Sequence, residues 1–458
     1  MDLNKLQSFF FVGVAGTGMS AIAQYLAGKG KQVAGSDRQF AQGNTEIKGQ
    51  LERAGIACHP QDGSGIDAST QAVVVSTAIE ATNPEYRKAV ALGIPVVKRS
   101  ELLAMISDNA CTIAVGGTSG KSTTTAMIFH ILQQCGCDPS LITGAGLTRL
   151  QADGRIGNAY VGQSDWLVIE ADESDGSIVG YHPEIAVLLN MERDHKEMEE
   201  LETLFATFKA HTRKAFVVNA DNAPAARLSA GEAFEFSTRK PSAGVCGSGF
   251  KQEGFSIAFQ VNGLPCSLPL IGRHNMENAL AALAVCREAG VALADGIRAL
   301  AGFEGIYRRT QLVGYNSVRD IHVIDDFAHN PSEVACAIRA CQAVAPRVTA
   351  YFQPHGYGPL RFMHEDLARE AAEALREQDI LVVSDVYYAG GTVDRDIESN
   401  VVSEAVVRAG RQAVHTGNRE QTLQWLAAHA VDHSVILVMG ARDPRLPELA
   451  KQVLEQLA

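Results

Sequence analysis

Residues 112–123 read TIAVGGTSGKST, and the rest of the chain is organised around this stretch. Its apolar start predicts a short buried strand ending at Val115, and residues 124–134 predict an amphipathic helix. A glycine-rich turn between strand and helix points backbone N–H groups at one spot, where the helix N-terminus adds partial positive charge. Lys121 would reach the outer phosphates of a bound nucleotide and the Ser122 hydroxyl would hold magnesium. Because the strict pattern has Gly where Val115 stands, this is a variant P-loop, and an ordinary glycine-rich turn is the alternative.

The composition sets the outer bounds. A chain of 458 residues suggests roughly three domains of about 150 residues each. The hydrophobic fraction of 46% is that of a core-forming soluble protein. A net charge of −12 disfavours a nucleic-acid partner. No apolar run is long enough for a bilayer, and the N-terminus lacks the layout of a signal peptide, so we expect no membrane association.

Nine scattered cysteines in a large acidic chain predict reduced thiols and a cytoplasmic location. Cys135 and Cys137 lie close together, but no second Cys or His pair stands near them at zinc-ligand spacing. We therefore predict that they are packing residues.

A second glycine-rich turn opens the chain. An apolar strand over 9–14 runs into Gly13–Ser20, and a helix follows to about residue 27. This resembles the phosphate turn of a dinucleotide fold, with Ala15 where the fingerprint has its second Gly. Asp37 ends the next strand, where an acid can hydrogen-bond a ribose. NAD, a nucleotide-sugar diphosphate and a close-packed turn without ligand all remain possible.

Acidic residues follow a later buried strand. Residues 170–175 read EADESD after the apolar strand 166–170. Acids at the carboxyl end of a strand in a P-loop fold suit magnesium, which prefers oxygen ligands. The alternative is a solvated acidic loop. His195 follows the next apolar strand, over 185–190, and could ligate metal or hydrogen-bond within its loop.

The last third of the chain again alternates strands and helices. Apolar strands over 323–326, 348–352, 380–385 and 435–439 predict a second doubly wound unit. Short alternating pieces between residues 234 and 270 predict an antiparallel patch before it. We expect an α/β protein of three domains: Rossmann-like 1–108, P-loop ATPase-like 109–311 and Rossmann-like 312–458.

The motifs in this order resemble those of the Mur ligases, the ATP-dependent amide ligases of peptidoglycan precursor synthesis. The resemblance covers nearly the whole chain. It is carried by these stretches: Gly13–Ser20, Ser76–Ile79, Gly117–Thr125, Glu170–Asp175, Asn190–His195, Gly272–Ala279, Arg308–Gln311, Asp325–Pro331, Gln353–His355 and Asp385–Tyr387.

The resemblance implies roles for particular residues. The first domain would hold the uridine diphosphate, with these residues near it: Gly16, Gly18, Met19, Asp37, Ser76 and Thr77. ATP would be held by Gly117, Thr118, Gly120, Lys121, Ser122, Thr123, His274, Asn275, Arg309 and Asp326. Mg²⁺ would be held by Ser122, Glu173 and His195. The catalytic set would be Lys121, His195 and His355, and the amino acid would meet His329 and Arg361.

The chemistry implied is carboxylate activation. A carboxylate accepts an amine poorly, so it first attacks the γ-phosphoryl group of ATP and becomes an acyl phosphate. The amine then attacks the acyl carbon, and phosphate leaves through a tetrahedral intermediate. Closure of the domains would exclude water, which otherwise hydrolyses the acyl phosphate. The implied reaction joins an amino acid, in the first instance L-alanine, to UDP-N-acetylmuramate.

The chain departs from the family pattern on the amino-acid side. Relatives that add L-alanine follow Gln-Pro-His with Arg-aromatic-x-Arg, whereas Gly356-Tyr357-Gly358-Pro359 stands here and only Arg361 remains. Arg442 stands where the pattern has Gly in Gly-Ala-Gly-Asp. A missing guanidinium removes a bidentate carboxylate clamp. The ATP and magnesium positions are kept.

Three alternatives follow. The chain could use another amine, such as a preformed peptide in murein recycling, or another acceptor in specialised metabolism. It could be a non-catalytic relative that binds a nucleotide sugar, although intact Lys121, Glu173 and His195 argue against this. An NAD oxidoreductase would leave the P-loop unexplained. We expect small-molecule substrates, no nucleic-acid or membrane partner, and a monomer or homodimer.

Overall fold

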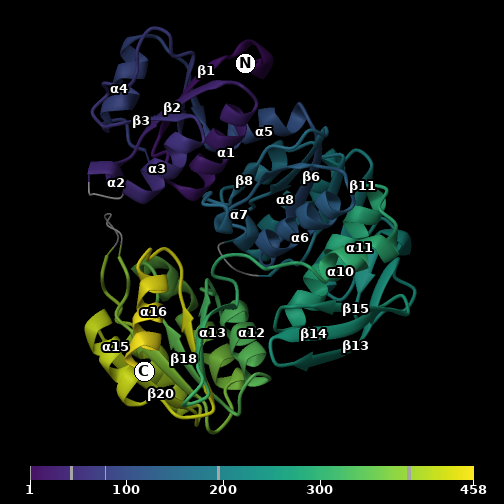
Figure 1. The fold of residues 1–458 in the computed structure, drawn as a ribbon, viewed down its shortest axis with the longest axis vertical. Helices are drawn as coiled ribbons and strands as arrows, with labels where there is room; N and C mark the ends of the chain where they lie inside the picture. The colour runs from purple at the N-terminus through teal and green to yellow at the C-terminus, as the bar shows by residue number, and fades with distance from the viewer. Residues whose placement is uncertain (1, 42–44, 78, 193–195, 389–393, 458) are drawn as a thin grey trace. The chain divides into compact units, whose positions relative to one another are not determined.

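The computed structural model describes the chain except residues 1, 42–44, 78, 193–195, 389–393 and 458. It contains three sheets that follow one another along the chain, from purple to yellow in Figure 1. The expected α/β class with three domains is confirmed. Among the described residues, no helix combines the length and apolar character needed to cross a membrane.

The first sheet has five parallel strands in the order β3-β2-β1-β4-β5, which is a Rossmann-type arrangement. Its strands are β1 (Ser8–Val12), β2 (Gln32–Ser36), β3 (Ile56–His59), β4 (Ala72–Val75) and β5 (Val96–Lys98). Its helices are α1 (Thr17–Gly28), α2 (Arg38–Ala41), α3 (Thr45–Arg53), α4 (Pro84–Ala91) and α5 (Arg99–Asp108). Alternate residues of β1 face opposite sides, because Phe9 and Phe11 pack with α1 and α5 whereas Phe10 packs with α4.

The central sheet has ten strands in the order β15-β14-β13-β12-β11-β10-β6-β9-β7-β8. They are β6 (Cys111–Gly116), β7 (Ser140–Ile142), β8 (Ala159–Tyr160), β9 (Trp166–Glu170), β10 (Ile185–Leu188), β11 (Ala215–Asn219), β12 (Glu235–Ser237), β13 (Val245–Glu253), β14 (Ser256–Val261) and β15 (Leu264–Leu268). Its helices are α6 (Lys121–Gln134), α7 (Thr148–Ala152), α8 (Met198–His211), α9 (Ala223–Ala226), α10 (Arg273–Glu288) and α11 (Leu293–Leu300). The P-loop strand β6 lies between β10 and β9 and is parallel to both.

The predicted antiparallel patch is formed by β13, β14 and β15. These strands are hydrogen-bonded neighbours joined by two-residue turns, a connection that reverses the chain. In the second turn, Asn262 and Gly263 have φ values of 49° and 82°, which fits a type I′ hairpin turn. The patch continues the P-loop sheet rather than standing apart from it.

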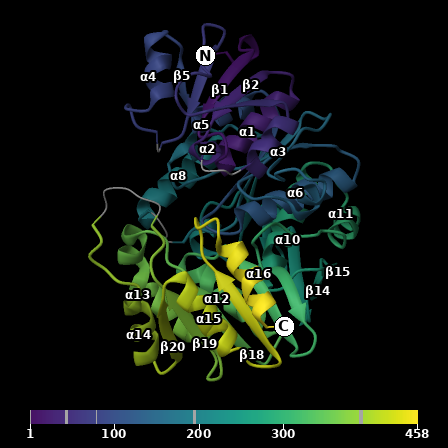
Figure 2. The ribbon, with the colours of Figure 1, turned by 60° about the vertical axis from the view of Figure 1, so that its left-hand side comes forward.

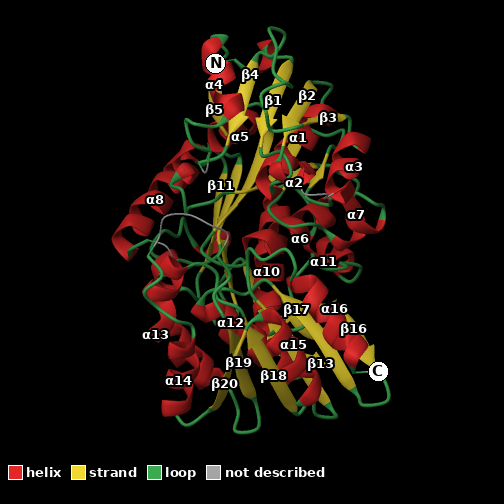
Figure 3. Cartoon of the chain, turned by 90° about the vertical axis from the view of Figure 1, so that its left-hand side faces the viewer, coloured by secondary structure: helices red, strands yellow, loops and turns green. Residues whose placement is uncertain are grey.

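The third sheet has six strands in the order β16-β17-β21-β18-β19-β20, and only β16 runs antiparallel to its neighbour. They are β16 (Gln311–Asn316), β17 (Ile321–Asp326), β18 (Arg347–Phe352), β19 (Ile380–Ser384), β20 (Gln412–Gly417) and β21 (Ser434–Met439). The helices are α12 (Pro331–Gln342), α13 (Tyr357–Ala374), α14 (Asn400–Arg408), α15 (Arg419–Ala428) and α16 (Leu446–Gln456). Helices α12–α14 cover one face, and α15 and α16 cover the other (Figures 2 and 3).

The internal contacts divide the chain into two compact units. The first comprises Met1–Ser248, Gln260–Cys266 and Glu277–Ile306, and the second comprises Gly249–Phe259, Ser267–Met276 and Tyr307–Ala458. The tip of the β13–β14 hairpin therefore belongs with the third sheet. Its Gln252 side chain donates to the Ala340 carbonyl (3.0 Å).

Candidate active site

The P-loop has the backbone that its glycines predict. Gly117 and Gly120 have φ values of 141° and 83°, in a backbone region that residues other than glycine rarely adopt. A Cβ at Gly120 would also lie 2.6 Å from the Asn278 amide oxygen. Helix α6 begins at Lys121, three residues before the predicted start, because Gly120 turns the chain directly into the first helical turn. The first N–H groups of this helix lack carbonyl partners within it and can therefore bind an anion.

Asn190 holds the loop in shape. It follows β10, and its Oδ1 accepts from the Thr118 hydroxyl (2.9 Å) and from the Ser119 N–H (2.9 Å). Its Nδ2 donates to the Ser119 carbonyl (3.1 Å). The sequence alone assigns Asn190 no role. The available signal was a polar residue ending a strand parallel to the P-loop strand, since such strand ends meet at one sheet edge.

Lys121 is paired with the acidic loop that follows β9. Its Nζ lies 2.9 Å from Glu173 Oε2 and donates to the Gly117 carbonyl (2.6 Å). Burial opposes the charge of Lys121, but Glu173 and Asp172 outweigh it and hold the pKa of Lys121 above its ordinary value. Burial raises the pKa of Glu173, and Lys121 offsets part of that rise. The structure therefore brings together two residues that the sequence predicted for ATP and magnesium.

The donor set fits magnesium. Ser122 lies in the first turn of α6 and is buried, as is the Glu173 carboxylate. His195, the third predicted ligand, lies outside the described residues. Among the residues that are described, no three His, Cys, Asp or Glu side chains gather as a metal cluster. The Ser122 hydroxyl and the Glu173 carboxylate are oxygen donors, and Mg²⁺ binds such donors together with several waters and phosphate oxygens.

The first phosphate turn is held by Asp37. Its Oδ2 accepts from the Ala15 N–H (3.0 Å), and its Oδ1 accepts from the Gln39 N–H (2.9 Å). Both oxygens thus bind backbone, and a ribose contact stays a prediction. Gly16 and Gly18 lie at the start of α1, whereas the Met19 side chain is buried in the core and leaves only its backbone for a ligand. Ser76 and Thr77 follow β4 directly.

Arg99 was not predicted at this turn. A Cβ on Gly18 would lie 3.2 Å from Arg99 Nη1, so the guanidinium lies over the turn. Its Nη2 is 3.6 Å from Asp175 Oδ2 in the acidic loop. This places a cation between the first phosphate turn and the loop that carries Glu173. No sequence spacing links these three segments.

A second group of predicted residues lies in the second unit, around Glu333. Its Oε1 is 3.5 Å from Arg309 Nη1 and its Oε2 is 3.1 Å from His329 Nδ1. Although burial opposes it, His329 and Arg309 hold the pKa of Glu333 well below its usual range. Burial, with Arg309 nearby, lowers the pKa of His274 to about 4. Glu333 was missed because Asn330-Pro331-Ser332-Glu333 reads simply as the start of a capped helix.

Asp326 and Arg309 contact residues of the two segments on either side of β16 and β17, at the start of the third domain. Asp326 accepts from the N–H groups of Thr310 (2.5 Å) and Ala328 (2.7 Å). Burial raises the pKa of Asp326 to about 6. The Arg309 guanidinium lies 5.2 Å from the Phe327 ring centre, at cation–π distance.

The remaining predicted residues are held by local contacts. Asn275 donates from Nδ2 to the Ile271 carbonyl (2.7 Å). The His355 ring lies 5.3 Å from the His329 ring. Arg361 does not present a free guanidinium, because it pairs with Asp396 and donates to the Asp394 carbonyl (3.2 Å). To bind an amino acid as predicted, Arg361 would have to give up its ion pair with Asp396.

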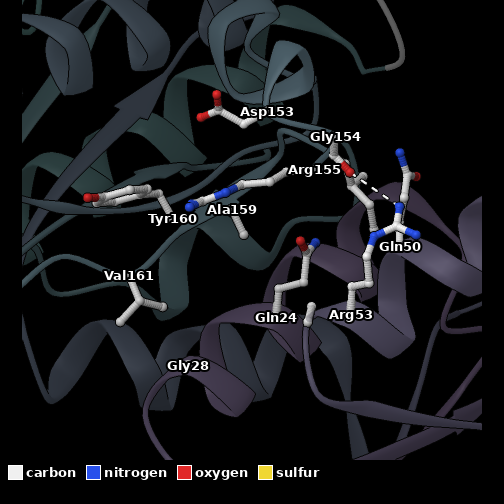
Figure 4. A pocket seen from close by; sticks show the side chains of 12 residues that line it. Gln24, Gly28, Gln50, Arg53, Asp153, Gly154, Arg155, Ala159, Tyr160 and Val161 are labelled. Atoms are coloured by element: carbon white, nitrogen blue, oxygen red, sulfur yellow. Dashed lines mark hydrogen bonds between the residues drawn. The ribbon is translucent and has the colours of Figure 1, made fainter.

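A separate cavity of about 420 Å³ lies in the first unit, lined by α1, α3 and residues 153–161 (Figure 4). Arg53 from α3 donates across it to the Gly154 carbonyl (3.5 Å). None of the predicted site residues lines this cavity.

The fold and the site together define a class of protein. Three family models match the chain in order: Mur ligase family, catalytic domain, over residues 8–110; Mur ligase middle domain over 115–286; and Mur ligase, glutamate ligase domain, over 308–442. The chain belongs to the Mur ligase family, as its motifs predicted. It is therefore an ATP-dependent ligase that forms carbon–nitrogen bonds.

Curated relatives align along their full length. A UDP-N-acetylmuramate–L-alanine ligase of Renibacterium salmoninarum is 35% identical, with 100% of this chain and 97% of the relative covered. One of Pelotomaculum thermopropionicum is 32% identical over 96% of both. The crystal structure of a UDP-N-acetylmuramate-alanine ligase from Thermotoga maritima matches with a TM-score of 0.80 at 25% identity, over 98% of both chains. A murein peptide ligase from Psychrobacter arcticus shares the fold, with a TM-score of 0.67 at 22% identity over 98% of both chains.

Proposed function

We propose that this chain joins L-alanine to UDP-N-acetylmuramate and converts ATP to ADP and phosphate, as a step in making peptidoglycan precursors. The observation that carries the proposal is the full-length match to L-alanine ligases at 32–35% identity. The enzyme would work in the cytoplasm, which agrees with nine free cysteines. The domains would be 1–108 for the UDP-sugar, 109–311 for ATP and 312–458 for the amino acid.

ATP would bind at the P-loop. The N–H groups from Gly117 to Thr123 and the start of α6 would bind its phosphates, in the shape that Asn190 fixes. Lys121 would leave Glu173 and bind the outer phosphates. Glu173, Ser122 and His195 would hold Mg²⁺, which supplies charge neutralisation on the phosphates. By the family resemblance, the nucleotide would also be bound by His274, Asn275, Arg309 and Asp326.

Two balanced steps follow. The substrate carboxylate attacks the γ-phosphorus of ATP, and the bond from that phosphorus to the β-phosphate oxygen breaks. The products of this step are ADP and an acyl phosphate. The neutral amine then attacks the acyl carbon, and the amide forms as phosphate departs and the amine loses a proton. Lys121 stabilises charge in the first step, and His355 with His329 would serve the second. The UDP moiety would be held by the turn at Gly16, Gly18, Met19 and Asp37 and by Ser76 and Thr77.

One observation favours a second candidate, the use of another amine such as a preformed peptide. The segment 356–359 carries no arginine, and the Arg361 guanidinium pairs with Asp396. A weakened carboxylate clamp would relax the choice of amine.

The test is phosphate release from ATP with UDP-N-acetylmuramate and Mg²⁺, against single amino acids and one tripeptide. Release with L-alanine supports the proposal. Release only with another amine would replace L-alanine by that amine. No release with any amine would refute UDP-N-acetylmuramate as acceptor.

A further inference from the structure

One arginine of the second unit has an unfavourable backbone conformation. Arg442 follows β21 and has a φ of +62°, in the left-handed region that arginine rarely adopts. It is exposed, and it makes neither a hydrogen bond nor an ion pair within the part of the chain that the structure describes. A solvated surface arginine gains nothing from such a backbone. Strain of this kind persists where the surroundings impose it, and it clusters at binding sites.

The surroundings of Arg442 are fixed on both sides. Before it, the Gly440 carbonyl accepts from Arg308 Nη2 (2.8 Å), and the Gly440 N–H donates to the Asp326 carbonyl (3.3 Å). After it, the buried Asp443 carboxylate accepts from Arg419 Nη2 (2.7 Å) and from the Arg445 N–H (3.0 Å). These hydrogen bonds hold the backbone on both sides of residue 442, whose guanidinium has no partner among the residues that the structure describes.

The location is a ligand-binding edge. Strands β17, β21, β18 and β19 are parallel neighbours, so the loops after them meet at one edge of the sheet, where doubly wound folds bind ligands. The loop after β21 touches the loop after β18, because a Cβ on Gly440 would lie 3.0 Å from the Gln353 carbonyl. Gln353 is two residues before His355. Arg442, two residues after Gly440, therefore follows its strand at the same sheet edge as the segment that carries His355.

A second polar group at this edge also lacks a partner. Gln353 is 7% exposed, and its Oε1 is buried without a hydrogen bond among the described residues. The edge therefore offers an unused cation and an unused hydrogen-bond acceptor. An amino acid carries the two complementary groups, a carboxylate and an amine. A phosphate would satisfy only the cation.

We infer that Arg442 binds the carboxylate of the incoming amino acid and so supplies the guanidinium that segment 356–359 lacks. The inference rests on the proposed function and deepens it at the amine site. A guanidinium can hold a carboxylate through two parallel hydrogen bonds, which fixes the orientation of the amine as well as its affinity.

The test compares Arg442→Gly with His433→Gly by steady-state phosphate release, at saturating ATP and UDP-N-acetylmuramate. His433 also has a positive φ, of 58°, but lies before β21, at the opposite end of the same strand. Both variants relieve a left-handed backbone; His433→Gly also breaks the exposed pair of His433 Nδ1 with Asp320 Oδ2 (2.9 Å), and only Arg442→Gly removes the proposed ligand contact. We expect Arg442→Gly to raise the KM for the amino acid about tenfold or more, with the KM for ATP unchanged. Arg442→Lys should recover part of the loss, since lysine keeps the charge without the bidentate geometry.

A second arm uses the amino acid amide in place of the acid. The parent should prefer the acid strongly, and Arg442→Gly should lose most of this preference. An unchanged amino-acid KM in Arg442→Gly would overturn the inference, as would a rise in the ATP KM alone, which would assign Arg442 to phosphate. A parent inactive with every amine would overturn the proposed function and this inference with it. An unfolding midpoint of Arg442→Gly at or above that of the parent shows that the KM change is not a loss of fold.

Discussion

Replacing Lys121 by methionine tests the P-loop assignment and the energetics of its ion pair together. The Lys121 side chain is 18% exposed and that of Glu173 is 5% exposed, with 2.9 Å between Nζ and Oε2. Methionine keeps the length of the side chain but leaves Glu173 as a buried, unpaired carboxylate. Removing one partner of such a pair costs about 3–5 kcal/mol, because the desolvation of the other is no longer compensated.

The pH dependence of this loss has a defined sign. Without Lys121, the main influence that lowers the pKa of Glu173 is gone, so burial raises that pKa further. When the pKa of a carboxyl is higher in the folded chain than in the unfolded chain, stability falls as the pH rises from the unfolded pKa to the folded pKa. The reason is that the unfolded chain ionises first. The destabilisation of Lys121→Met should therefore be smaller at low pH than at high pH.

The assay is urea unfolding followed by tryptophan fluorescence. The chain has two tryptophans, Trp166 in the first unit and Trp425 in the second, so a Trp425→Phe background reports the unit that holds the P-loop. Lys121→Met should lower the midpoint and abolish phosphate release, and adding Glu173→Gln should restore most of the midpoint but no turnover. Lys48→Met is the matched control, since the Lys48 and Glu52 side chains of its ion pair are 42% and 50% exposed and its loss should shift the midpoint far less.

Two outcomes would refute this reasoning. An unchanged midpoint in Lys121→Met would mean that the ion pair is not buried as described. Retained turnover would remove Lys121 from the ATP site.

Two further predictions use the same measurements. Asn190→Ala removes three hydrogen bonds to the P-loop and should raise the KM for ATP about tenfold, equivalent to about 1.4 kcal/mol, while an unchanged KM would show that the loop keeps its shape alone. Asp326 has a pKa raised to about 6, so its contribution to the stability of the second unit is present at low pH and is lost as the pH rises to about 6. Asp326→Asn should flatten this part of the unfolding profile, read by Trp425 fluorescence, and a profile that keeps its slope would assign the titration to another group.

Much of the fold could be predicted because the signals are local. Apolar runs such as 185–188 and 435–438 are buried strands of parallel sheets, and the glycines of the P-loop mark backbone that only they adopt easily. The extent of the central sheet could not be predicted. Its pairing of β12 with β11 joins three-residue and five-residue strands, and no pattern in such short segments fixes their partners.

The ATP side of the site could be predicted for the same reason. Its phosphate-binding groups, Gly117 to Thr123, are consecutive, and their spacing is set by one turn of one helix. Glu173 was found because acids cluster visibly after a strand. Asn190 and Arg99 were missed because each acts on a segment far from it in the sequence, and their types are common in loops.

The amino-acid side follows a different rule. Its groups come from the ends of several strands, and the strands that lie side by side, β17, β21 and β18, are far apart in the chain. A guanidinium needed at this edge can be supplied from the loop after β18 or from the loop after β21, and no spacing relates the two. The absence of arginine at 356–359 therefore does not by itself predict the loss of carboxylate binding. The backbone of Arg442 is the observation that motif comparison lacks: an arginine held at a φ of +62°, two residues after the Gly440 that approaches Gln353, is the guanidinium we propose for this role.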